Sequence, residues 1–172
     1  NGSHLQAGAV LRNMYYKDEV EDKDRIVTGW GASLSGIWQF AENTSLCFQG
    51  VYGKGISNYI QDISGSGLDL VPSATAEGKL KAFNAWGGYI GFSHNWSKVL
   101  TSNIMYSYAR ALDRYGMPAT SYKYAQYAAA NLFWDFSEYG SCAIEYVFGR
   151  RNDFNKDYGN ASRINTMIQY RF

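Results

Sequence analysis

The sequence predicts an all-β protein, an antiparallel up-and-down transmembrane β-barrel that contributes eight strands within one domain, residues 1–172. Three observations support this prediction. Apolar residues alternate with polar or small ones through most of the chain, which is the pattern of strands with two different faces. Aromatic residues make up 17% of the sequence and gather near the predicted strand ends. Short and long connections alternate along the chain, as they do in outer-membrane barrels.

The composition excludes several other classes of protein. With 18 glycines but only 2 prolines, the chain has neither a collagen-like nor a disordered composition. It lacks a run of about 18 apolar residues, the length that a transmembrane helix needs, and the mean hydropathy is −0.35. The N-terminal residues lack the charged and apolar regions of a secretion signal. A formal net charge of +1 indicates no nucleic-acid partner.

The strands are expected where alternation is bounded by turn-forming residues. They span residues 5–16, 25–40, 45–60, 81–94, 99–113, 122–134, 141–151 and 162–172. Three connections are short: residues 41–44, 95–98 and 135–140. The others are longer and more polar: residues 17–24, 61–80, 114–121 and 152–161. Since short turns face the periplasm and long loops the exterior, this alternation predicts the direction of every strand.

The alternation divides the strands into an apolar and a polar face. From the second strand onward, the apolar residues occupy the even-numbered positions, as in Trp30, Leu34 and Trp38. The first strand is ambiguous, since placing Leu5, Ala7, Ala9 and Leu11 outward leaves Gln6 and Arg12 inside. Alternation alone does not say whether the apolar face points into a soluble barrel or out into lipid.

The spacing of the aromatic residues favours the lipid-facing orientation. On the apolar face they lie near strand ends, with aliphatic and small residues between them, and ten tilted residues rise about 25 Å, the height of a lipid-facing band. A lipocalin-type carrier, with the apolar face inside, is the alternative, but its core has no reason to place aromatics at two levels. The expected girdle residues are Trp38, Trp86, Trp96, Tyr108, Tyr124, Trp134 and Phe172.

The polar face supplies the candidate pore-lining residues. They are Arg12, Asn103, Lys123, Asn131, Glu145, Arg151, Arg163, Gln169 and Arg171. Cations outnumber acids in this set, so one interpretation is a basic constriction that attracts small anions. The other is that the arginines pair with Glu145 and plug a small barrel, since side chains alone fill an eight-stranded barrel.

Other reactive residues suggest no catalytic, cofactor or metal site. The two histidines, His4 and His94, have no partners at metal-ligand spacing, and no set of acid, base and nucleophile suggests an enzyme. Cys47 lies on the polar face and Cys142 on the apolar face, which disfavours a disulfide. The acidic run around Asp22 is either a solvated loop or a site for divalent cations that bridge lipopolysaccharide. The run comprises Asp18, Glu19, Glu21, Asp22 and Asp24.

Several segments resemble those of the DcaP-like porins. The last strand, residues 163–172, ends the chain on an aromatic residue after alternating apolar positions, as outer-membrane proteins do. The other similar segments are Glu145-Tyr146-Val147-Phe148-Gly149-Arg150-Arg151, Ala161-Ser162-Arg163-Ile164, Leu11-Arg12-Asn13, Gly50-Val51-Tyr52-Gly53-Lys54-Gly55 and Trp86-Gly87-Gly88-Tyr89. The resemblance covers the whole chain but only the C-terminal half of such a porin.

The resemblance implies a larger, trimeric barrel of up to sixteen strands in a Gram-negative outer membrane. Its expected function is passive diffusion of small solutes, and the basic polar face favours anions. The implied partners are outer-membrane lipid, lipopolysaccharide, the barrel assembly machinery, the transported solutes and two further copies of the chain. The alternative is a non-conducting eight-stranded barrel with a structural or adhesive role.

Overall fold

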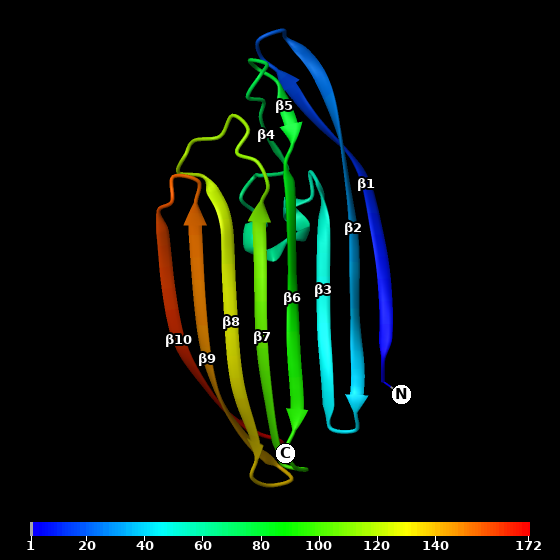
Figure 1. Cartoon of the computed structure of the whole chain (residues 1–172), viewed down its shortest axis with the longest axis vertical. Helices are drawn as coiled ribbons and strands as arrows, with labels where there is room; N and C mark the ends of the chain where they lie inside the picture. The colour runs from blue at the N-terminus through cyan, green and yellow to red at the C-terminus, as the bar shows by residue number, and fades with distance from the viewer. Residues whose placement is uncertain (1) are drawn as a thin grey trace.

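The computed structural model describes residues 2–172 and is almost entirely β-structure (Figure 1). Within these residues, eight strands form one antiparallel sheet in the order β1-β2-β3-β6-β7-β8-β9-β10, and two short strands form a separate hairpin, β4-β5. Each strand of the large sheet pairs with the one that precedes it in this order, which confirms the predicted up-and-down arrangement. No helix in the described part of the chain is long and apolar enough to cross a membrane.

The elements follow the predicted strands closely, with one exception. Their bounds are β1 (His4–Asp18), β2 (Lys23–Ala41), β3 (Thr44–Lys54), η1 (Ser57–Tyr59), η2 (Gln61–Ile63), β4 (Leu70–Pro72), β5 (Leu80–Ala82), β6 (Asn84–Asn95), β7 (Leu100–Ala111), β8 (Tyr122–Asp135), β9 (Gly140–Asp153) and β10 (Tyr158–Tyr170). The exception is the strand predicted to run to residue 60. It ends at Lys54, because Gly55 has a φ of +67° and turns the chain away from the sheet.

The residues that follow, 55–83, form what we call the inserted segment. It contains η1, η2, β4 and β5, and it packs against one face of the large sheet, behind the strands in the view of Figure 1. We call that face of the sheet the inner face and the opposite one the outer face.

The strand register determines which residues share a face, because directly paired residues point to the same side. Leu11 pairs with Trp30 and Gln6 with Ser35, so odd positions of β1 share a face with even positions of β2. From β2 to β10 the even positions face outward almost throughout. This register resolves the ambiguity of the first strand, with Leu11 outside and Arg12 inside.

A bulge interrupts the alternation at the start of β8. The register shifts between Tyr122 and Tyr124, so Tyr122 turns to the inner face and donates a hydrogen bond from its hydroxyl to the Ala109 carbonyl at 2.8 Å. Lys123, which alternation places on the inner face, occupies this bulge. Its expected inward orientation therefore does not follow from the strand pattern.

The large sheet is open within residues 2–172. Each of its two edge strands, β1 and β10, pairs on one side only, and they lie at opposite sides of the sheet (Figure 1). The expectation that eight strands close on themselves is therefore wrong for this part of the chain. Both edges present unpaired backbone N–H and C=O groups, which in proteins are normally covered or paired by a further strand.

Candidate functional site

The inserted segment covers the upper part of the inner face, toward the long loops. Ile56 and Phe83 are both 0% exposed, and Ile60 and Ile63 join them in one apolar cluster. The strand residues beneath this cluster are small, and three of them are Ala85, Ala109 and Ala111. A Cβ added at Gly87 would lie 3.0 Å from the Ile60 side chain, so the sheet approaches the segment too closely for larger residues.

Polar contacts fasten the same segment to β1. The Arg12 guanidinium donates to Asp69 Oδ2 at 2.9 Å and to the Gly55 carbonyl at 3.2 Å. Asp69 also accepts hydrogen bonds from Ser57 Oγ at 2.7 Å and Asn58 Nδ2 at 2.9 Å. Arg12 is thus neutralised by an acid, as one of the two interpretations of the sequence expected, but the acid is Asp69 rather than Glu145.

The lower part of the inner face, toward the short turns, carries a ladder of amides around one carboxylate. Asn103, Asn131, Glu145 and Asn165 face one another directly across β7 to β10. Asn103 donates to Asn131 at 2.8 Å, Asn131 to Glu145 at 3.3 Å, and Asn165 to Glu145 at 2.9 Å. The structure therefore brings three predicted site residues together and adds Asn165.

Glu145 does not form the arginine plug that a closed eight-stranded barrel would need. Its two carboxylate oxygens accept hydrogen bonds from Asn131 and Asn165, and no arginine among residues 2–172 forms an ion pair with it. Its negative charge remains on the inner face.

A second polar row lies between the ladder and the inserted segment. Its members are directly paired across six neighbouring strands: Gln6, Ser35, Gln49, Tyr89, Ser107 and Tyr127. Hydroxyl and amide groups dominate this row, and such groups exchange hydrogen bonds readily with water and with hydrophilic solutes.

The remaining predicted pore-lining residues lie nearer the end of the chain. Arg151 forms an ion pair with Asp153 at 3.0 Å. On β10, Arg163 is exposed and pairs with Val147 of β9, and Gln169 pairs with Ser141 of β9. Arg171 follows β10 and lines a cavity of about 350 Å³ at the short-turn rim. Of these residues, Arg163 is the cation that β10 presents on the inner face.

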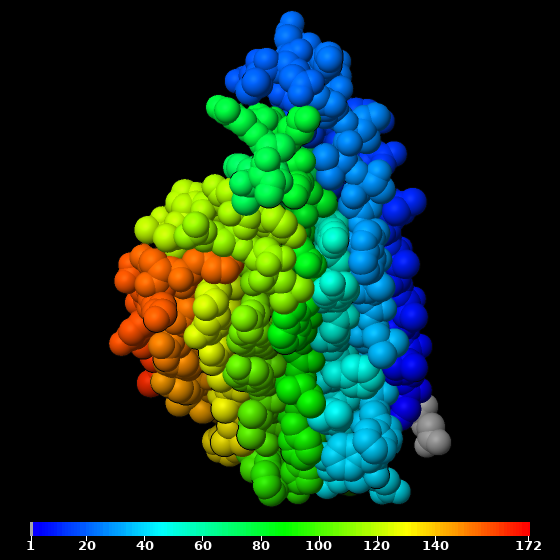
Figure 2. Space-filling model, turned by 45° about the horizontal axis from the view of Figure 1, so that its top comes forward, coloured from blue at the N-terminus to red at the C-terminus, as the bar shows by residue number. Residues whose placement is uncertain are grey.

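The outer face is apolar and uncovered over the height of the strands. Ile104 is 61% exposed and Leu34 47% exposed, and their neighbours on this face are also large and apolar. Figure 2 shows the strands packed side by side into a continuous wall. Soluble monomers rarely expose contiguous apolar surfaces larger than a few hundred Å², so this wall is suited to lipid or to another apolar partner.

The predicted girdle residues form two oblique bands on this face. The residues paired in one row with Trp38 across the next four strands are Leu46, Phe92, Ile104 and Ala130. Trp134 lies four residues beyond Ala130 on the same strand, so the band shifts by about one residue at each strand pairing. One residue per pairing corresponds to a tilt of about 35°, which is the tilt of barrel strands in a membrane. The lower tryptophans would therefore lie at one level in a bilayer.

The upper band is built from contacting aromatic rings. The ring centroids of Trp86 and Tyr108 are 5.1 Å apart, and those of Tyr108 and Tyr124 are 5.5 Å apart. Trp96, in the turn after β6, and Phe172, beyond β10, are exposed at the short-turn end. Each of the seven predicted girdle residues thus lies within three residues of a strand end, inside the strand or beyond it.

Sequence reasoning missed the inserted segment and the role of Asp69. One signal could have revealed the segment: Ile56, Ile60 and Ile63 are spaced by four and three residues, the period of a helical turn rather than of a strand. The partnership of Asp69 with Arg12 had no local signal, because the two residues are 57 positions apart.

Comparisons with known proteins support the fold. No protein-family model matches the sequence, and no curated protein matches it either. The crystal structure of the outer membrane channel DcaP of Acinetobacter baumannii is similar, with a TM-score of 0.75 and 20% sequence identity. The similarity covers 98% of this chain and 47% of that one, so the chain spans about half the length of the channel that it resembles.

Proposed function

We propose that this chain forms part of the wall of a porin-type channel in a bacterial outer membrane, through which small hydrophilic solutes diffuse. One observation carries the proposal: a tilted antiparallel sheet with an uncovered apolar outer face, a polar inner face and two unpaired edges resembles half of a channel wall. The proposed role needs no catalytic group, metal or cofactor.

Closure by further strands would produce the channel. Barrels of about sixteen strands enclose water, whereas eight strands leave room only for side chains. The edges β1 and β10, 15 and 13 residues long, are available to pair with those strands. The open edges favour this arrangement over the non-conducting eight-stranded barrel. Assembly by the barrel assembly machinery and trimerisation in the outer membrane of a Gram-negative bacterium are parts of the same proposal.

The inserted segment would narrow such a channel, and the charges beside it would select its solutes. Arg12 is neutralised by Asp69, so the unpaired charges at the inner face of the described residues include Arg163 and Glu145 on neighbouring strands, Asp62 in the inserted segment and Arg171 at the short-turn rim. We propose a preference for small anions, because Arg163 is exposed whereas the Glu145 carboxylate already accepts two amide hydrogen bonds. Fixed positive charge in a narrow lumen enriches anions locally.

Planar-bilayer recordings of the whole gene product test the proposal. We expect steady ohmic conductance, and a reversal potential in a KCl gradient that indicates anion preference. Arg163→Gln should weaken that preference. Lys98→Gln, which removes a charge from an exposed short turn, is the matched control and should leave it unchanged. Absence of conductance would refute the channel, and cation selectivity would refute the assignment of the arginines.

A further inference from the structure

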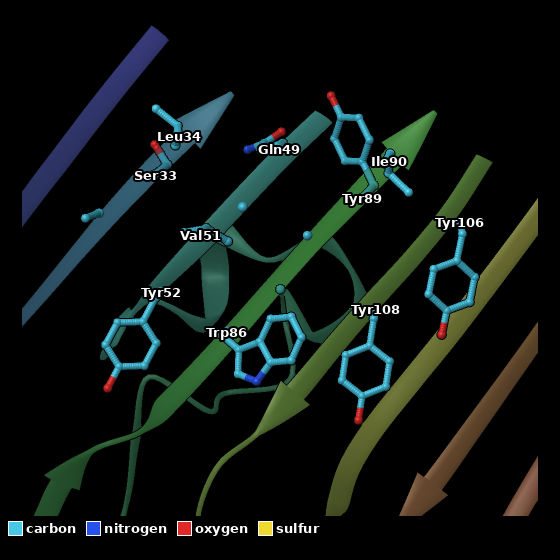
Figure 3. Close-up of a pocket in the computed structure, with 14 residues that line it drawn as sticks. Ser33, Leu34, Gln49, Val51, Tyr52, Trp86, Tyr89, Ile90, Tyr106 and Tyr108 are labelled. Carbon is cyan, nitrogen blue, oxygen red and sulfur yellow. The ribbon is translucent and has the colours of Figure 1, made fainter. Parts of the chain in front are cut away.

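A groove on the outer face has a glycine floor and aromatic walls. Gly50 and Gly88 pair directly and leave the backbone bare, while Tyr52, Trp86 and Tyr108 rise around them. In Figure 3, Trp86 and Tyr108 lie in front of the strands, and the inserted segment lies behind them. The groove has a volume of about 670 Å³, within the range of small-ligand sites.

The two glycines keep the groove open whatever rotamers the surrounding side chains adopt. A Cβ added at Gly50 would meet no atom within 4 Å, so its floor is free space. A Cβ added at Gly88 would come within 2.6 Å of the Gln49 carbonyl oxygen, so no larger residue fits there without a backbone shift. The walls are apolar except for the hydroxyl and indole N–H groups at their upper ends, which is suited to an alkyl chain below a polar headgroup.

Cations stand directly above this groove. Lys54 is the next outer-face residue after Tyr52, and Arg110 is the next after Tyr108 and pairs with Trp86. The two lie two strands apart, and Lys54 is two residues further toward the long loops, because Arg110 shares its pairing row with Trp86 and Tyr52. Their Cα atoms are therefore about 12 Å apart, a separation that two long side chains and a phosphate can span. Within residues 2–172, neither forms an ion pair with a carboxylate, and Arg110 Nε is buried with no hydrogen-bond partner.

The charge on this face is confined to one level. The outer-face positions of β3 and of β6 to β10 include three cations, Lys54, Arg110 and Arg150, and no acid. All three lie at the long-loop ends of their strands. At the short-turn ends the outer-face positions of these strands carry aromatic residues, and the cations there, Lys98 and Arg171, lie in a turn and beyond β10. The long-loop side of an outer-membrane barrel meets the outer leaflet, where the headgroups are phosphorylated.

We propose that this groove binds a phosphorylated, acylated glycolipid of the outer leaflet, with one acyl chain between Tyr52 and Tyr108 and a phosphate between Lys54 and Arg110. This proposal rests on the lipid-facing orientation of the outer face in the proposed function. Arginine and lysine both bind phosphate, and the Arg110 guanidinium beside the aromatic band forms no ion pair with any carboxylate of residues 2–172.

Native mass spectrometry of the delipidated whole gene product in detergent tests the site. Purified bisphosphorylated lipid A is the probe, and the same lipid without its phosphates is the comparison. We expect one lipid bound per chain, with about fivefold weaker binding for Arg110→Gln and for the dephosphorylated lipid. Gly50→Leu should fill the groove and remove most binding without disturbing the fold.

Ala130→Leu is the matched control. It fills a second groove of about 650 Å³ on the same face, at the short-turn end, whose lining contains no cation. Equal binding by wild type, Arg110→Gln and Gly50→Leu would overturn the proposal, as would equal loss in Ala130→Leu. Disulfide cross-linking of Gly50→Cys between two copies would make the groove a subunit interface and would also overturn it. If the wild-type protein binds the lipid but does not conduct in planar bilayers, the channel is refuted and the lipid site is not.

Discussion

The covered and the open parts of the inner face share the same strands but are built differently. Beneath the inserted segment the inner residues are alanines such as Ala85 and Ala109, and the contacts are apolar. Nearer the short turns they are Asn103, Asn131 and Glu145, and the contacts are hydrogen bonds. Alternation therefore selects which residues point inward, whereas the size and polarity of their side chains determine whether the inserted segment packs on that surface or water covers it.

The largest expected effect comes from removing the centre of the covered part. Phe83→Ala should destabilise the docking of residues 55–83 by about 3–5 kcal/mol, because Phe83 is fully buried and its loss leaves a cavity. Amide hydrogen exchange should show faster exchange in this segment, and single-channel conductance should rise. Phe133→Ala is the control, because Phe133 lies on the inner face outside the apolar cluster, and it should reduce stability less. An equal loss of stability at both positions would contradict the distinction between the covered and the open part.

Ile104 and Asn103 are adjacent in β7 but point to opposite faces, so arginine substitutions there compare the stability cost of a charge on the outer face with that on the open part of the inner face. Ile104→Arg should destabilise the folded protein in vesicles by about 2–4 kcal/mol, since Ile104 lies between the two aromatic bands of the outer face, where we expect contact with lipid. Asn103→Arg should cost about 1 kcal/mol, the loss of one hydrogen bond. Urea titrations in vesicles measure both. Equal tolerance would mean that the outer face does not contact lipid.

Breaking the Arg12–Asp69 ion pair would leave an unpaired charge in the covered part, as the open part already has at Glu145. Asp69→Asn should destabilise the docked segment by about 1–2 kcal/mol and strengthen anion preference, because Arg12 would lose its neutralising partner. Arg12→Gln should cost a similar amount without that gain in selectivity. Reversal potentials distinguish the two variants, and identical shifts would contradict the assigned role of the pair.

The hairpin that joins β1 to β2 should lose stability in acid. Burial raises the pKa of Asp18, but hydrogen bonds from the Glu21 and Val20 backbone N–H groups and from Arg25 outweigh it and lower the pKa below its usual 3.8. The stabilisation is therefore present above pH 3.8 and lost as the pH falls through the lowered pKa. Hydrogen exchange across this range should show the hairpin loosening first. Asp18→Asn should remove that pH dependence.

The smallest effect on stability is expected at the end of the chain, beyond the open part. Phe172 is fully exposed, so its deletion should barely change refolding in detergent. We expect assembly in cells to suffer more, because residues 163–172 resemble the aromatic-ended strand that outer-membrane proteins present to the assembly machinery. Pulse-chase assembly assays compare the two. Equal losses in both assays would make Phe172 simply one more girdle residue.

Most of the sheet was predictable from the sequence because its signals are local. Alternation placed seven of the eight strands within a few residues of their observed bounds, and it put Asn103, Asn131 and Glu145 on one face. The overrun of the third strand shows where this reasoning fails. Gly55 and the helical spacing of Ile56 and Ile60 end that strand, and apolar residues alone did not distinguish strand from turn.

Periodicity along single strands is therefore enough to predict the strands, the two faces of every strand but the first, and the aromatic residues near the strand ends. The register between strands assigned the faces of β1 and showed that the aromatic bands are oblique. The tertiary structure decided which acid neutralises Arg12, which residues the inserted segment covers, and that β1 and β10 stay unpaired within residues 2–172. Those features depend on contacts between residues tens of positions apart. A pattern with a period of two carries no information about such distances.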